Sequence, residues 1–163
     1  TAMQTDTRMT YDVLGRLDTV EVREQGGINL SFSDRQITDY DYDVLGNLDL
    51  VTASNGVISD YEYDDLNRLD TLTHYRPDTT PNDLSDNAKL ARFDYTVLAN
   101  GTRSGLTEEF WTDDNATSAS TPDLTNTYDW NYDAANRLNV SFPVGENITV
   151  ATVTPESLRV ERE

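Results

Sequence analysis

The sequence predicts an all-β protein in which antiparallel β-hairpin repeats form a curved or spiralling sheet. The pattern Tyr-Asp-x-x-Gly/Asn-Arg/Asn-Leu occurs four times, beginning at Tyr11, Tyr42, Tyr63 and Tyr132. Gly or Asn fills its fifth position every time, and aromatic residues alternate with polar ones before it. A unit that recurs at intervals of roughly 20 to 50 residues is typical of a repeat architecture.

The repeated pattern predicts a tight turn between two strands. Gly and Asn enter positive φ at low cost, so the fifth position is predicted to be left-handed. The Asp before it can accept hydrogen bonds from turn amides, as in an Asx-turn. With the Arg that follows, these structural turn residues are Asp12, Gly15, Arg16, Asp43, Gly46, Asp64, Asn67, Arg68, Asp133, Asn136 and Arg137. A looser fifth copy begins at Tyr95 and ends at Gly101.

The strands before the turns predict an aromatic ladder, because residues two apart share one face of a strand. Its members are Tyr11, Tyr40, Tyr42, Tyr61, Tyr63, Phe93, Tyr95, Tyr128, Trp130 and Tyr132. The acidic residues between the rings are predicted to face the other way: Asp41, Glu62, Asp94 and Asp129.

In chain order, the pattern divides residues 1–142 into hairpin units near 8–33, 36–60, 57–75, 90–110 and 126–142. Ser54-Asn55-Gly56 predicts a two-residue hairpin turn, and Gln25-Gly26-Gly27 predicts a second. Residues 76–88 and 112–125 lack apolar periodicity and are predicted to be long loops. Residues 143–163 diverge into one more strand and a charged tail. No segment gives a convincing helix.

The charge excludes two classes of partner. Thirty acidic against twelve basic residues give a net charge of -18 and a pI near 4.1. Binding to nucleic acid or to anionic lipid requires a positive surface, so neither is predicted as a partner. No apolar run approaches the length that spans a membrane, so no membrane insertion is expected. Rows of acidic residues instead discourage the pairing of exposed strand edges.

The candidate catalytic and metal-binding residues give weak signals. The same acids recur in every unit, which favours turn capping over one active site, so no enzyme activity and no cofactor are predicted. His74 is the only histidine and cysteine is absent, which removes the usual zinc ligands. Asp113, Asp114 and Asn115 could meet a calcium ion in a loop, although they do not form an EF-hand pattern.

Trp111 stands outside the ladder, since it follows Phe110 and precedes an acidic loop. It is therefore the first candidate for an exposed ring that binds a ligand, by stacking on a sugar or by anchoring a protein interface. The ladder rings recur at equivalent positions, so packing against neighbouring hairpins explains them without a ligand.

The pattern Tyr-Asp-x-x-Gly-Arg-Leu, followed by a strand, a Gly-containing turn and an aromatic strand, resembles the YD repeat of the RHS family. This family includes bacterial RHS proteins, shell components of insecticidal toxin complexes and teneurins, and the resemblance covers roughly residues 8–142. It implies a sheet of hairpins that winds into a hollow shell, which encloses cargo in toxin-type members and forms a cell-surface or adhesive body in others. The capping and self-cleaving segment of toxin-type shells has no counterpart after Leu138, and the long loops resemble those of very large bacterial surface YD proteins.

The resemblance therefore predicts a fragment of a large bacterial surface or secreted YD protein, with any targeting signal outside this sequence. Its predicted function is that of a non-catalytic structural module that builds a β-shell or adhesive scaffold. The alternative is a module that binds carbohydrate or cell-surface proteins through exposed aromatics and long loops. The expected partners are neighbouring YD repeats of the parent chain and, in the alternative, glycans or cell-surface proteins.

Overall fold

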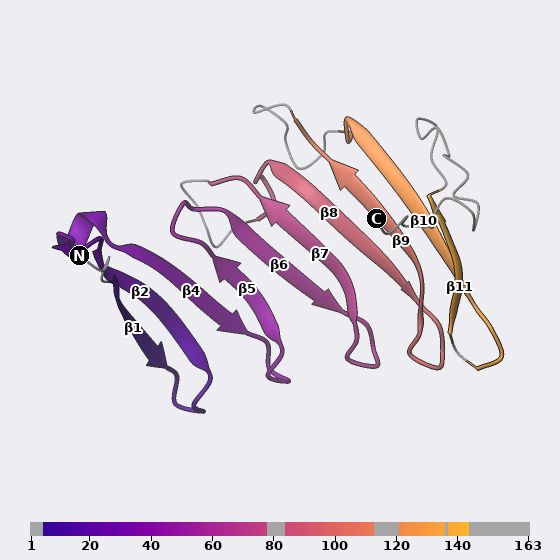
Figure 1. Ribbon diagram of the computed structural model, residues 1–163, viewed down its shortest axis with the longest axis horizontal. Coiled ribbons are helices and arrows are strands. Elements are labelled where there is room, and N and C mark those ends of the chain that lie inside the picture. The colour runs from indigo at the N-terminus through magenta and orange to yellow at the C-terminus, as the bar shows by residue number, and fades with distance from the viewer. Residues whose placement is uncertain (1–4, 78–83, 113–120, 136, 144–163) are drawn as a thin grey trace, which may run out of the picture.

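The computed structural model describes residues 5–77, 84–112, 121–135 and 137–143, and these residues form one antiparallel sheet (Figure 1). The predicted all-β class is confirmed. The strands follow one another in the order β1-β2-β4-β5-β6-β7-β8-β9-β10-β11, and the short β3 pairs with β2 alone. Their bounds are β1 Thr5–Tyr11, β2 Leu17–Gln25, β3 Ile28–Asn29, β4 Gln36–Tyr42, β5 Leu48–Thr52, β6 Ile58–Tyr63, β7 Leu69–Tyr75, β8 Lys89–Val97, β9 Arg103–Phe110, β10 Leu124–Tyr132 and β11 Leu138–Pro143.

The connections form two rows, one at each end of the strands (Figure 1). The lower row in the figure holds the turns that join β1 to β2, β4 to β5, β6 to β7, β8 to β9 and β10 to β11. The opposite ends of the strands carry the short turns after β2 and β5 and the described ends of the two long connections predicted from the sequence. They also carry the 3-10 turn η1 (Phe32–Asp34), the only helical element in the described part of the chain. No helix there is long and apolar enough to cross a membrane.

The strand register separates the two faces of the sheet by chemistry. Tyr61 lies opposite Leu72, which lies opposite Phe93, so these three share the face that we call the aromatic face. Glu62 lies opposite Thr71, which lies opposite Asp94, on the other face, called here the acidic face. Because directly opposed residues of antiparallel strands project to the same side, this register places the rings and the acids on opposite faces.

Buried side chains gather at the end of strands β6 to β9 where the long connections leave the sheet. Ile58 and Asn87 are 1% exposed and Trp111 is 4% exposed. The Arg76 amide donates to the Ala88 carbonyl at 2.8 Å, and the Trp111 amide donates to the Leu90 carbonyl at 3.0 Å. These backbone bonds hold the described ends of both connections against the sheet.

Candidate functional site

The repeated turn has the same backbone in the first three motif units. In the first, the Asp12 amide donates to the Arg16 carbonyl at 2.9 Å and the Gly15 amide donates to the Asp12 carbonyl at 3.0 Å. Gly15 has φ +78°, and the equivalent Gly46 and Asn67 have φ +91° and +63°, which agrees with the predicted left-handed slot. Asn136, the fourth predicted turn former, lies outside the described residues.

The motif Asp closes this turn with its carboxylate. Asp12 Oδ1 accepts the amides of Leu14 at 2.8 Å and Arg16 at 2.9 Å, and Oδ2 accepts Arg16 Nε at 2.7 Å. These bonds, first among them the one from the Arg16 amide, lower the pKa of Asp12 below its ordinary value. The same arrangement recurs at Asp43, Asp64 and Asp133, with Asn47, Arg68 and Arg137 as the side-chain donors.

Two other turns have this backbone without the carboxylate, and both correct a sequence prediction. The Ala53 amide donates to the Val57 carbonyl at 2.8 Å, so the loop predicted as a two-residue turn at Ser54-Asn55-Gly56 encloses three residues. Here Asn55 Oδ1 accepts the Val57 amide at 3.1 Å in place of an Asp. By contrast, Gln25 pairs with Ile28, and both glycines between them have positive φ, as a two-residue type I′ turn requires.

The second correction concerns the fifth copy of the motif. The Leu98 amide donates to the Thr102 carbonyl at 2.9 Å, and Gly101 has φ +86°, so Leu98 takes the place of the motif Asp. Val97, whose partner is Arg103 across a register shift, therefore takes the place of the motif Tyr. The copy that the sequence pattern aligns on Tyr95 is displaced by two residues, because Tyr95 lies two positions before Val97, which holds the place of the motif Tyr.

The motif Tyr forms a bond between neighbouring hairpins. The Tyr42 hydroxyl of the second hairpin donates to the Leu17 carbonyl of the first at 2.9 Å, and Tyr63 donates to the Leu48 carbonyl of the second at 2.9 Å. In the last hairpin, Tyr132 donates to the Arg103 carbonyl at 2.7 Å. Each acceptor is the first residue of the strand that leaves the preceding turn. The sequence prediction missed this role and treated the Tyr only as a ladder ring.

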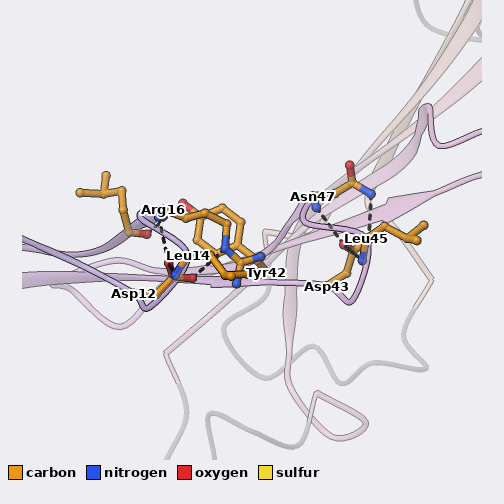
Figure 2. Close-up of polar contacts among 8 residues, drawn as sticks. Asp12, Leu14, Arg16, Tyr42, Asp43, Leu45 and Asn47 are labelled. Atoms are coloured by element: carbon orange, nitrogen blue, oxygen red, sulfur yellow. Dashed lines mark hydrogen bonds and ion pairs between the residues drawn. The ribbon is translucent and has the colours of Figure 1, made fainter.

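The sixth motif residue makes a second contact with the next hairpin. Figure 2 shows the Arg16 guanidinium lying against the Tyr42 ring, with its Cζ atom 4.3 Å from the ring centroid. Asn47 exchanges side-chain hydrogen bonds with Asn67 of the next turn. Arg68 Nη1 donates to the Leu98 carbonyl of the following turn at 2.7 Å. Side-chain contacts therefore join successive turns to one another at this end of the strands.

The ladder residues on the aromatic face lie beside the residues opposite them on the neighbouring strands. Tyr40 lies opposite Val51, and Tyr95 lies opposite Leu106, which lies opposite Tyr128. The ladder residue Phe93 also meets the rings of two neighbouring strands edge-on. Its ring centroid lies 5.9 Å from that of His74 and 6.0 Å from that of Phe110. Trp130, another predicted ladder residue, lies on β10.

The exposed binding ring predicted at Trp111 is wrong. The side chain is 4% exposed, Lys89 Nζ lies 5.4 Å from its ring centroid, and its carbonyl accepts Arg76 Nη2 at 3.3 Å. Trp111 directly follows β9, and its amide still bonds to the Leu90 carbonyl of the neighbouring β8. The calcium candidates Asp113, Asp114 and Asn115 lie outside the described residues. Within the described ranges, no group of three or more His, Cys, Asp or Glu could hold a metal ion.

The acidic face carries carboxylates that repel one another. Burial, and then the nearby Glu62 and Asp49, raise the pKa of Asp60 to about 6. Asp39 lies on β4, which β5 separates from β6, and its pKa is raised by burial and by Asp41 and Asp18. Asp18 and Asp49 directly follow a motif Leu, as does Asp70, and this repetition in the sequence is the signal that could have located them.

Comparisons with known proteins give a structural match. No protein-family model matches the sequence, and no curated protein matches it. The fold is similar to a chain in the crystal structure of TcdB2-TccC3-Cdc42, with a TM-score of 0.59 and 21% identity over 85% of this chain. A chain in the crystal structure of TcdB2-TccC3-TEV gives a TM-score of 0.50 and 18% identity, also over 85%. The alignments cover 6% and 8% of those chains, so the similarity establishes the fold of a segment.

Proposed function

We propose that this chain is a non-catalytic structural module, a strip of laterally bonded hairpins that builds a β-shell or scaffold in a large RHS-like protein outside the cell or on its surface. The observation that carries the proposal is the hydroxyl bond from one hairpin to the preceding one, made by Tyr42, Tyr63 and Tyr132. A residue repeated for chemistry would converge on one site, whereas these tyrosines are distributed along the sheet and join successive units.

Two further observations support a scaffold. The segment shares its fold with TcdB2-TccC3 chains, which are far longer than this one. Its sheet also has two faces of different chemistry, as a wall between two environments requires. The neighbouring repeats of a parent chain are the partners in this proposal. The alternative, a glycan-binding module, loses its principal residue with the burial of Trp111.

A thermal-shift screen of the purified chain against glycans and calcium tests the proposal. A ligand present at 100 times its Kd stabilises the folded state by about 2.7 kcal/mol, which for a chain of this size raises the midpoint by roughly 5 to 10 °C. The structural module predicts a cooperative melt that none of these additions moves. A rise with one glycan, or a rise with calcium that EDTA reverses, would contradict it and favour the binding module.

A further inference from the structure

The dipeptide Asn-Gly occurs twice in the sequence, and both copies lie in hairpin turns. Asn55-Gly56 lies between β5 and β6, and Asn100-Gly101 lies between β8 and β9. In both turns Oδ1 of the Asn accepts the backbone amide two residues further along the chain, at 3.1 Å for Asn55 and at 3.0 Å for Asn100. The Asn side chain therefore folds back over the amide of its own Gly, as in an Asx-turn.

This arrangement brings together the two groups that react when asparagine deamidates. The nucleophile is the backbone nitrogen of the following residue, and the electrophile is the side-chain carbonyl carbon Cγ. Gly101 has no Cβ, which allows its nitrogen to approach Cγ of Asn100 closely. The Thr102 amide donates to Asn100 Oδ1, the oxygen on which negative charge develops during the attack, so this amide is placed to stabilise that charge.

The two turns differ in how freely they can move. Their Gly amides are bonded alike, because each donates to the carbonyl three residues before it, Gly56 at 2.8 Å and Gly101 at 2.9 Å. A Cβ built on Gly56 would lie 2.8 Å from Pro77, whereas one on Gly101 would meet no described atom within 4 Å. Ring closure requires the Asn-Gly peptide to rotate, and such local motion is easiest where few contacts resist it. The turn between β8 and β9 therefore allows the reaction, and the turn between β5 and β6 resists it.

We propose that Asn100 is a modification site at which the folded chain deamidates spontaneously, faster than at Asn55. The Gly101 nitrogen loses its proton and bonds to Cγ, and the bond from Cγ to Nδ2 breaks as Nδ2 takes up a proton and leaves as ammonia. Water then opens the cyclic succinimide at one of its two carbonyls, which gives aspartate or isoaspartate at this position. Water is the only co-reactant, and nothing is oxidised or reduced.

The products change a turn that takes part in the contact between hairpins. Either product adds one negative charge. Isoaspartate also lengthens the main chain by one atom inside the loop that is closed by the bond from the Leu98 amide to the Thr102 carbonyl. The Leu98 carbonyl of this loop accepts Arg68 Nη1 from the preceding turn at 2.7 Å. The modification therefore lies beside a lateral contact, and the inference goes beyond the proposed function without depending on it.

Peptide mapping by mass spectrometry of the purified chain, incubated at mildly alkaline pH, tests the inference. Both positions are followed in the same sample, so the rate at Asn55 is an internal control. Asn100 is expected to deamidate at least about fivefold faster, which corresponds to a difference of about 1 kcal/mol in the barrier. In urea, where the turns are lost, the two rates should become alike, because each dipeptide precedes a β-branched residue, Val57 or Thr102.

A variant tests whether packing protects the slower position. Pro77→Gly removes the carbons that lie against Gly56, so it should raise the rate at Asn55 in the folded chain and leave the rate at Asn100 unchanged. Equal rates in the folded parent, or a faster rate at Asn55, would overturn the inference. A difference that persists unchanged in urea would assign it to the local sequence and remove the role of the fold. A Pro77→Gly variant that reacts at Asn55 as slowly as the parent would contradict the protection by packing.

Discussion

Replacing Gly46 by valine tests whether the left-handed turn slot specifies the hairpin. Gly46 has φ +91°, and a Cβ added there would meet only Arg16 Nη1, at 3.9 Å, which is ordinary contact. The loss on substitution therefore comes from the backbone and not from a clash. A left-handed conformation costs an L-residue about 1 to 2 kcal/mol, and β-branching adds to this, so we expect a loss of about 2 kcal/mol.

The matched control is Gly46→Asn, because Asn67 occupies the equivalent slot at φ +63°. Asparagine tolerates this region, so the control should lose less than about 1 kcal/mol. For a chain of this size, 1 kcal/mol corresponds to about 2 to 4 °C, so differential scanning calorimetry should find the valine variant about 4 to 8 °C below the parent. Valine and asparagine variants that both melt at the parent's midpoint would refute the turn argument.

Three further predictions concern packing and charge. Gly56→Ala should lose about 1 kcal/mol or more beyond Gly15→Ala in urea unfolding, because both have positive φ but only at Gly56 would a Cβ lie 2.8 Å from Pro77; equal losses would contradict the close approach. Trp111→Ala should destabilise the chain by about 3 to 5 kcal/mol in the same assay, as expected for a buried ring, and a loss typical of a surface site would contradict its burial. Because the folded pKa of Asp60 is raised to about 6 from 3.8, its contribution to stability falls as pH rises through this window; Asp60→Asn should therefore melt higher than the parent at pH 7 and lose this advantage near pH 4, and a constant difference across a pH series would contradict the shift.

The local parts of this fold are those that the sequence predicts well. A turn that needs positive φ admits few residues, so Gly46 and Asn67 identify it without knowledge of the rest of the chain. Alternation along a strand likewise separates Tyr61 from Glu62 because it depends on the backbone alone. The all-β class and the order of the hairpins follow from these two local rules.

Contacts between hairpins could not be predicted in the same way. The bond from Tyr42 to Leu17 depends on the register shift that follows each turn and on how the next hairpin is placed, and neither is encoded by residue spacing. The burial of Trp111 could not be predicted for a related reason, because it depends on contacts with Lys89 and Arg76, which lie far from it in the sequence. The displaced copy at Tyr95 shows that the turn bonds, and not the aromatic residue, define the repeat.

If lateral bonds join the hairpins into one cooperative sheet, two probes of urea unfolding should respond alike to Tyr42→Phe. Both tryptophans, Trp111 and Trp130, lie in the C-terminal half of the sequence, whereas far-UV circular dichroism reports on the whole sheet. Loss of the hydroxyl bond, worth about 1 kcal/mol, is expected to lower both midpoints equally. A fluorescence midpoint that stays at the parent value while the dichroism transition shifts or broadens would show that the hairpins unfold independently.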